Sequence, residues 1–202
     1  MTVVKICGIC NAADAAAAMD AGADMLGFHF CPSPRRITPG EAAAIVDALP
    51  ARPSLVGVFI DEAAQRVGEV ARRCSLDLVQ LHGSEPAGYS PGVPIMKVLK
   101  VRDRGIPDAG DWPDPLMLDS WSADQRGGTG RSWDWEQARA LLAHRKVFVA
   151  GGLDADNVGE LVLRYRPHGV DVSSGVEAAP RRKDPAKMRA FVAAVRRADE
   201  QR

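Results

Sequence analysis

The chain opens with a short apolar run that stops at a glycine, Val3-Val4-Lys5-Ile6-Cys7-Gly8. The run is too short and too rich in β-branched residues for a helix, so it predicts a buried strand with Cys7 at its C-terminal tip. A helix over residues 11–21 is predicted next, because Asn11 can cap it and alanines follow. In parallel α/β folds binding sites collect at the carboxyl ends of strands, and the helix N-terminus is expected to favour the Cys7 thiolate. A lone cysteine is otherwise a small buried hydrophobe.

The same alternation of apolar runs and helical patterns continues to the end of the chain. Further strands are predicted at 24–30, 55–60, 77–82, 95–99, 116–119, 147–150 and 169–173, and helices at 39–49, 62–73, 135–143 and 184–197. The segment from 100 to 115 holds Gly105, Pro107, Gly110 and Pro113, so the fifth helix is expected to be missing or vestigial. The pattern predicts a small (β/α)₈ barrel.

An open, doubly wound sheet is the alternative fold. It is disfavoured because no G-x-G-x-x-G follows any strand and because polar residues end strands all along the chain instead of at one switch point. The chain has 202 residues, 46% of them apolar, and no Gly/Ser tract or charge block divides it. One domain spanning residues 1–202 is therefore expected.

Charge and cysteine content narrow the functional classes. Lys plus Arg and Asp plus Glu both number 26, so the zero net charge points to no nucleic acid and no membrane surface as partner. The N-terminus has no charged leader followed by a long apolar segment, and no run approaches transmembrane length, which predicts a cytoplasmic protein. The four cysteines do not resemble a secreted disulfide framework.

Motifs at the strand ends share their order and spacing with one known family. They are Lys5-Ile6-Cys7-Gly8, a Pro-rich loop reaching Arg36, Val79-Gln80-Leu81-His82-Gly83, Leu118-Asp119 with Gly127-Gly128-Thr129-Gly130, Gly151-Gly152-Leu153, and Asp171-Val172-Ser173-Ser174-Gly175-Val176-Glu177. Together they resemble the phosphoribosylanthranilate isomerases of tryptophan biosynthesis, across essentially the whole chain. The resemblance implies a (β/α)₈ barrel that converts N-(5′-phosphoribosyl)anthranilate into 1-(2-carboxyphenylamino)-1-deoxyribulose 5-phosphate by an Amadori rearrangement, with no metal and no organic cofactor.

The rearrangement needs one acid and one base. The acid protonates the ring oxygen to open the ribose, and the base then removes the C2′ proton. By resemblance, Cys7 is the base and Asp119 the acid. A cysteine with a pKa of about 8.5 is only a few per cent thiolate at neutral pH, so Cys7 needs help from its surroundings, whereas Asp119 must keep its proton, which partial burial favours.

The seventh and eighth strands end in small residues that fit a phosphate group. Gly151-Gly152 and Ser173-Ser174-Gly175 are expected to bind it through backbone amides and a short helix N-terminus, although glycines also end strands for steric reasons. By resemblance, Arg36 pairs with the anthranilate carboxylate, whereas its neighbour Arg35 is expected to be a solvated charge.

Four further residues are expected at the site. Gln80 and His82 share one face of their strand and are expected to orient the substrate or line its pocket, with His82 in a supporting role. Gly128 lies in the glycine-rich loop after Asp119 and is placed among the substrate-binding residues. Asp171 is two residues before Ser173 and is expected to share its inward face, in a role that the sequence leaves open.

The sequence departs from the family pattern at three places: Cys10, Cys31 and Ser120-Trp121. The two cysteines raise alternative functions. Cys7-x-x-Cys10 is typical of thioredoxin-like redox motifs, and with His29 and Cys31 it forms a conceivable Cys₃His zinc site. A redox domain leaves the other strand ends unexplained, and zinc would consume the catalytic thiol. A sugar-phosphate epimerase and a non-catalytic binding protein on the same scaffold remain alternatives, and the sequence leaves monomer and homodimer open.

Overall fold

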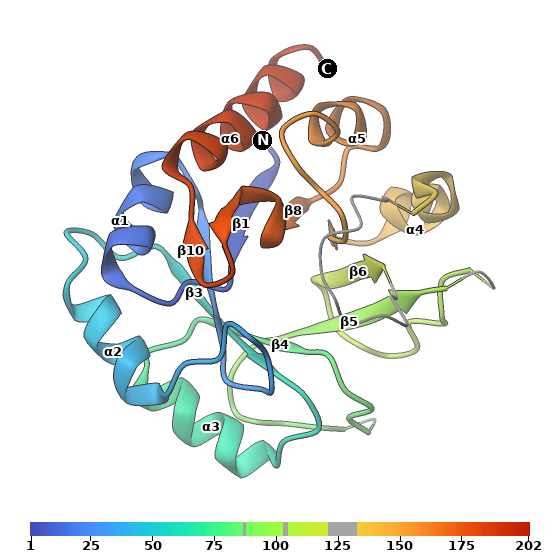
Figure 1. Cartoon of the computed structure of the whole chain (residues 1–202). Helices are drawn as coiled ribbons and strands as arrows, with labels where there is room; N and C mark the ends of the chain where they lie inside the picture. The colour runs from blue at the N-terminus through green and yellow to red at the C-terminus, as the bar shows by residue number, and fades with distance from the viewer. Residues whose placement is uncertain (87, 103–104, 121–132) are drawn as a thin grey trace.

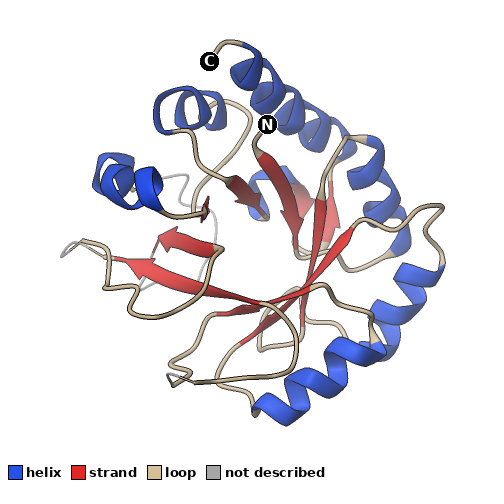
Figure 2. Cartoon of the chain, turned by 180° about the vertical axis from the view of Figure 1, so that it is seen from behind, coloured by secondary structure: helices blue, strands red, loops and turns tan. Residues whose placement is uncertain are grey.

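In the computed structural model, which describes residues 1–86, 88–102, 105–120 and 133–202, eight parallel strands close into a barrel in sequential order. Figures 1 and 2 show the ring of strands from its two sides. The strands are β1 Val3–Cys7, β2 Met25–His29, β3 Ser54–Phe59, β4 Leu78–Leu81, β5 Ile95–Val101, β6 Leu116–Ser120, β7 Val147–Val149 and β8 Gly169–Val172. The closed parallel barrel predicted from the sequence is confirmed, and the open sheet is wrong because β8 pairs with β1.

Six α-helices of the described residues surround the barrel. They are α1 Ala12–Asp20, α2 Pro39–Asp47, α3 Ala64–Arg73, α4 Arg139–His144 after a 3₁₀ turn Trp135–Ala138, α5 Val158–Tyr165 and α6 Pro185–Glu200. No helix is present in the described residues between β5 and β6, where the fifth helix was expected to be absent, and none between β4 and β5. Loops cover this flank of the barrel in Figure 1. Nowhere in the described chain is a helix long and apolar enough to cross a membrane.

Local sequence explains where the first helices begin. The side chain of Asn11 accepts the backbone N–H of Asp14 ahead of α1, and Thr38 and Glu41 form a capping box at the start of α2. Pro39 follows as the first residue of α2, where its missing N–H removes no helical hydrogen bond. The Asn11 cap agrees with the sequence prediction, because it depends on residues only three positions apart.

Side chains alternate between the barrel interior and the helix layer. Along β1, Val4 and Ile6 pack in the main apolar core against the helices, whereas Lys5 reaches Asp171 inside the barrel. The interior near the amino ends of the strands is apolar, with Val56, Met96, Met117 and Phe148 among its members. Polar side chains therefore concentrate at the carboxyl ends.

After β8 the chain forms a small cap that the sequence did not predict. A 3₁₀ turn, Ser174–Val176, leads into an antiparallel pair, β9 Glu177–Ala179 and β10 Arg182–Lys183. The N–H of Lys183 donates to the buried carboxylate of Asp14 at 2.9 Å, which ties this pair to α1. Glu177 and Lys183 are thereby brought next to the ends of β1 and β2.

Candidate active site

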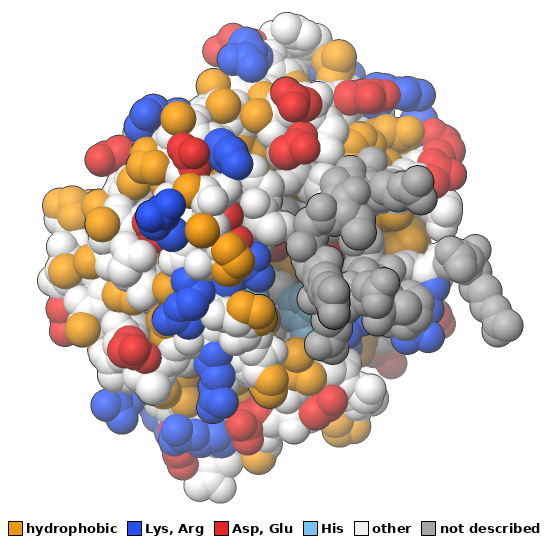
Figure 3. Space-filling model, viewed as in Figure 1, with side chains coloured by type: hydrophobic (Ala, Val, Ile, Leu, Met, Phe, Trp, Pro, Cys, Tyr) orange, Lys and Arg blue, Asp and Glu red, His pale blue; other side chains and the backbone are white. Residues whose placement is uncertain are grey.

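A cavity of about 640 Å³ opens at the carboxyl ends of the strands. Figure 3 shows it as a hollow with histidine surface inside and Lys and Arg side chains along one edge. All predicted site residues line it except Arg36 and Gly128: Cys7, Gln80, His82, Asp119, Gly151, Gly152, Asp171, Ser173, Ser174 and Gly175. The sequence prediction that these residues share one site is therefore supported by their positions, whereas Gly128 lies outside the described residues.

Cys7 ends β1 as a buried thiol, with 3% of its surface exposed. Its Sγ lies 3.3 Å from Nε2 of His29, the last residue of β2. Burial raises the pKa of Cys7, and the cation of Lys5 only partly opposes this effect. The helix N-terminus was expected to favour the thiolate; α1 begins five residues after Cys7, and the net pKa of the thiol is nevertheless raised.

Lys5 lies inside the barrel beneath Cys7 and is fully buried. Its Nζ donates to Oδ1 of Asp171 at 2.6 Å. Burial by itself lowers the pKa of Lys5, but attraction to Asp171 and Cys7 outweighs burial and raises it. The ammonium is thus a fixed positive charge close to the thiol, and Asp171, whose role the sequence left open, is its partner.

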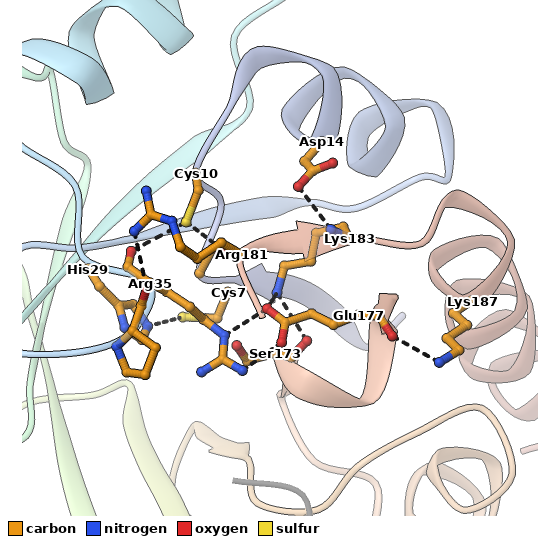
Figure 4. Close-up of polar contacts among 12 residues, drawn as sticks. Cys7, Cys10, Asp14, His29, Arg35, Ser173, Glu177, Arg181, Lys183 and Lys187 are labelled. Carbon is orange, nitrogen blue, oxygen red and sulfur yellow. Dashed lines mark hydrogen bonds and ion pairs between the residues drawn. The ribbon is translucent and has the colours of Figure 1, made fainter. Parts of the chain in front are cut away.

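A second buried ion cluster borders the same side of the cavity. Arg35 donates from Nε and Nη2 to the two carboxylate oxygens of Glu177 at 2.7 and 2.6 Å. Lys183 donates to Glu177 at 3.1 Å and to the backbone oxygen of Ser173 at 3.0 Å. Figure 4 shows Glu177 between these two cations, next to Cys7 and His29. The two cations outweigh the effect of burial and hold the pKa of Glu177 below its usual range.

The positions of the two neighbouring arginines correct one expectation. Arg35 is not a solvated charge, because its side chain is 16% exposed, pairs with Glu177 and lines the cavity. Arg36 is exposed and lines a separate groove beside Phe30 and Thr38. The side chains of Arg35 and Arg36 therefore face different hollows after β2.

Asp119 lies on β6, across β7 and β8 from Cys7, and is partly buried. Burial, followed by repulsion from Asp171, raises the pKa of Asp119 to about 6. The carboxyl group therefore keeps its proton to a higher pH than an ordinary aspartate, in agreement with the expectation from its sequence context.

Gln80 and His82 lie together on one wall of the cavity. Nε2 of Gln80 is 2.5 Å from Nε2 of His82, and the buried Oε1 of Gln80 has no partner among the described residues. Burial, then the charges of nearby cationic groups, lowers the pKa of His82 to about 3, so the ring is neutral and accepts the amide proton. The free amide oxygen is left as an acceptor next to the cavity.

The ends of β7 and β8 combine open backbone with a free hydroxyl. Gly151 and Gly152 have φ values of +90° and +68°, and a Cβ at Gly151 would lie 2.3 Å from Oγ of Ser120. A Cβ at Gly175 would lie 2.0 Å from the backbone oxygen of Leu153. The steric explanation for glycine therefore holds at Gly151 and Gly175. Ser173 adds a buried Oγ that has no hydrogen-bond partner in the described part of the chain.

Five residues of the site were not assigned by sequence reasoning: Lys5, His29, Arg35, Glu177 and Lys183. Lys5 and Glu177 lie within the motifs quoted from the sequence. The direction of their side chains, toward the site, was the signal that could have identified them.

Cys10 directs its thiol to the backbone oxygens of Gly8 and Arg35, at 3.5 and 3.4 Å. The Cys₃His zinc alternative is not supported, since the described residues contain no group of metal-ligating side chains arranged to hold an ion.

Comparison with known proteins identifies the family. The family model for N-(5'phosphoribosyl)anthranilate (PRA) isomerase matches residues 4–194. The chain belongs to this family. An N-(5'-phosphoribosyl)anthranilate isomerase of Geobacter sp. (strain M21) is 47% identical over 199 residues, which cover 96% of this chain and 97% of the relative. The chain is thus a PRA isomerase of tryptophan biosynthesis, as its strand-end motifs predicted.

Solved PRA isomerases share the barrel. The enzyme from Thermus thermophilus superposes with a TM-score of 0.87 at 38% identity and covers 97% of this chain and 99% of its own. Another PRA isomerase was solved in complex with reduced 1-(O-carboxyphenylamino)-1-deoxyribulose 5-phosphate, with a TM-score of 0.83, 34% identity and coverage of 97% and 99%. That relative binds a phosphorylated compound of the kind expected here.

Proposed function

We propose that the PRA isomerase reaction takes place in the cavity at the barrel mouth, with Asp119 as general acid and Cys7 as general base. The observation that carries this proposal is that both side chains line one cavity, at the ends of β6 and β1. The raised pKa of Asp119, about 6, suits a group that must donate a proton. Neither step needs a metal or an organic cofactor.

The first step opens the ribose ring. Asp119 gives its proton to the ring oxygen, the bond from C1′ to that oxygen breaks, and the lone pair of the anthranilate nitrogen forms a C1′=N double bond. The positive charge then on nitrogen acidifies the hydrogen at C2′. Burial of Asp119 favours this step because the protonated acid is the reactive form.

The second step moves the double bond. The Cys7 thiolate takes the C2′ proton, a C1′=C2′ bond forms, and the electrons of the C=N bond return to nitrogen. The resulting enol becomes the ketone when the 2′-hydroxyl loses its proton and C1′ gains one. The Lys5 ammonium stabilises the thiolate before this step. The two groups are close enough that the charge of Cys7 raises the pKa of Lys5.

The substrate's phosphate is proposed to bind at Gly151-Gly152 and Ser173-Ser174-Gly175. The free buried Oγ of Ser173 supports this assignment, because a phosphate oxygen would supply its missing partner. Lys183 and Arg35 lie beside Ser173 and add positive potential in a chain whose net charge is zero.

The anthranilate ring is proposed to lie toward Arg36, with its carboxylate paired to the guanidinium. Support comes from the exposed position of Arg36, which has no ion-pair partner among the described residues, and from its nearness to Cys31 on the cavity wall. Gln80 and His82 are proposed to orient the sugar, and Gly128 to contact the substrate from the loop after Asp119. We further propose a cytoplasmic enzyme of one domain, a monomer or a homodimer; the isomerase of Thermotoga maritima is described as dimeric.

Turnover of freshly prepared PRA, followed by the loss of its fluorescence, tests the acid and the base. Cys7→Ser and Asp119→Asn should each lower kcat by about 10²–10⁴-fold, because each group performs a step that the other cannot replace. KM should change little, since neither group is proposed to bind the phosphate or the carboxylate. Near-normal turnover by Cys7→Ala would remove the base assignment and return Cys7 to the role of a buried hydrophobe.

A further inference from the structure

We propose that His29 is a positioning residue that holds Cys7 as the thiolate by donating Nε2–H to its sulfur. This inference rests on the proposed role of Cys7 as the base. Three observations carry it: Nε2 lies 3.3 Å from Sγ, His29 ends the strand next to β1, and it lines the same cavity. Apart from the zinc alternative, which the described residues do not support, no sequence motif assigns a role to this histidine.

Ser33 contacts the other ring nitrogen of His29 and is compatible with the tautomer that donates to sulfur. Nδ1 of His29 is 2.9 Å from Oγ of Ser33, and the same Oγ accepts the backbone N–H of Arg35 at 3.1 Å. The Ser33 hydroxyl can donate its proton to Nδ1, and in that arrangement the ring proton of His29 is on Nε2, where it faces the sulfur. The ring is neutral, because burial, then Lys5, Arg35 and Lys183, lowers the pKa of His29 to about 3.

The space around the sulfur is built for this contact. A Cβ at Gly27, between Cys7 and His29 on the adjacent strands, would lie 2.7 Å from Sγ and 3.0 Å from Nζ of Lys5. Glycine at this position lets the thiol lie against β2, within reach of the imidazole. Figure 4 shows the His29 ring pointing at Cys7, with the Arg35 and Glu177 side chains beside them.

Charged groups face the pair from several elements. Lys5 from β1, Lys183 from β10 and Arg35 from the loop after β2 favour the thiolate, whereas Asp171 from β8 opposes it. Glu177 from β9 faces His29 and raises its pKa against the effect of these cations. His82 lies within electrostatic range of His29, and Cys31 lies within range of Cys7. Burial outweighs the cations, so an additional donor to sulfur is needed to populate the reactive base.

The pKa of Asp119 shows why a lower pKa of Cys7 increases the active fraction of the enzyme. The productive form carries a protonated Asp119 and an ionised Cys7, yet the pKa of Asp119, about 6, lies below the raised pKa of Cys7. Only a small fraction of the enzyme holds both forms at once, and this fraction grows tenfold for each unit by which the pKa of Cys7 falls. During the reaction the C2′ proton passes to sulfur and the ring proton stays on His29, so no other reactant is required.

Alkylation of Cys7 by iodoacetamide as a function of pH, read by mass spectrometry of the Cys7 peptide, tests the proposal. His29→Leu should raise the apparent pKa of this thiol by about one unit, because a hydrogen bond to the charged form is lost. The kcat at pH 7 to 8 should fall about tenfold with KM nearly unchanged. His29→Gln, whose amide supplies an N–H, should restore most of the lowered pKa of Cys7 and most of kcat. The control His144→Leu, at an exposed position, should match the unchanged enzyme.

Ser33→Ala provides a second measurement that keeps His29 in place. It should raise the pKa of Cys7 in the same direction by a smaller amount, because Nδ1 loses the hydroxyl donor that favours a proton on Nε2. An unchanged or lowered pKa in both His29→Leu and Ser33→Ala overturns the proposal. If His29→Leu does not fold, Ser33→Ala and His29→Gln decide. Turnover by Cys7→Ala tests the base itself and is read separately.

Discussion

The Cys7 side and the Asp119 side of the cavity differ in whether their buried charged groups have ion-pair partners. On the Cys7 side, Lys5 pairs with Asp171, and Arg35 and Lys183 share Glu177. On the other side, no cation within the described residues lies at ion-pair distance from Asp119, and Asp171 repels it. Paired charges are held in place as ions, whereas the unpaired carboxyl group responds to burial by keeping its proton.

This difference shows how one barrel mouth supplies both a base and an acid. Both groups have a raised pKa because of burial. The largest charge effect at Cys7 comes from Lys5 and opposes the rise, whereas the largest charge effect at Asp119 comes from Asp171 and adds to it. Asp171 acts on both, since it anchors Lys5 beneath the thiol and repels the acid. Burial alone favours the protonated form of both groups. The neighbouring charges then favour the base at Cys7 and the acid at Asp119.

Removing a paired charge should have the largest effect on stability. Lys5→Met leaves the Asp171 carboxylate buried without its partner, and the free energy of unfolding should fall by about 3–5 kcal/mol. Urea unfolding at pH 7 measures it. The matched control is Arg164→Met, which breaks the exposed pair with Glu160 on α5 and should leave stability nearly unchanged, because water and salt screen an exposed pair. Equal losses in the two variants would show that the buried pair is not special.

Removing the unpaired charge should have the opposite sign. The pKa of Asp119 in the folded protein, about 6, is above the ordinary value of 3.8, so the folded state loses stability as pH rises from about 4 through 6. Asp119→Asn should therefore stabilise the fold by up to about 3 kcal/mol at pH 7, from 1.36 kcal/mol per pKa unit. Urea unfolding should show the gain at pH 7 and not at pH 4. A destabilised Asn variant at pH 7 would mean that the carboxylate has a favourable partner.

The two neighbouring arginines should separate binding from stability. Arg36→Met should weaken substrate binding by about 2 kcal/mol, seen as a raised KM with unchanged unfolding, because a charge-assisted hydrogen bond to the carboxylate is lost. Arg35→Met should instead lower the unfolding free energy, since it leaves Glu177 with Lys183 alone. An unchanged KM in Arg36→Met would remove the carboxylate role.

Features set by nearby residues could be predicted from the sequence. The strand that delivers Cys7 and the helix cap at Asn11 depend on segments of a few residues. The position of Asp119 at a strand end also follows from a short apolar run. The convergence of the strand ends on one cavity followed from the repeated strand and helix pattern, because parallel strands bring their carboxyl ends together.

Features set by distant residues could not be predicted in this way. Lys5 and Asp171 are 166 positions apart, and Arg35 and Glu177 are 142 apart, so their pairing depends on barrel closure between β8 and β1. The direction of Arg35 depends on the loop after β2, where the strand periodicity has ended. The net effect on Cys7 depends on the balance between burial and several cations, which no local pattern reports.

The most direct test of Cys7 as base and Asp119 as acid is the ratio of turnover by Asp119→Asn to turnover by the unchanged enzyme between pH 6 and 9. In the unchanged enzyme, rising pH creates thiolate but removes the proton from Asp119, so these two effects cancel above about pH 6. The Asn variant has no proton to lose, so its residual turnover should climb about tenfold per pH unit until Cys7 ionises, and the ratio should climb with it. Ionisation of the substrate's phosphate affects both enzymes equally and leaves the ratio unchanged. A ratio that stays constant across this range would contradict the assignment of Asp119 as the acid that acts with the Cys7 thiolate.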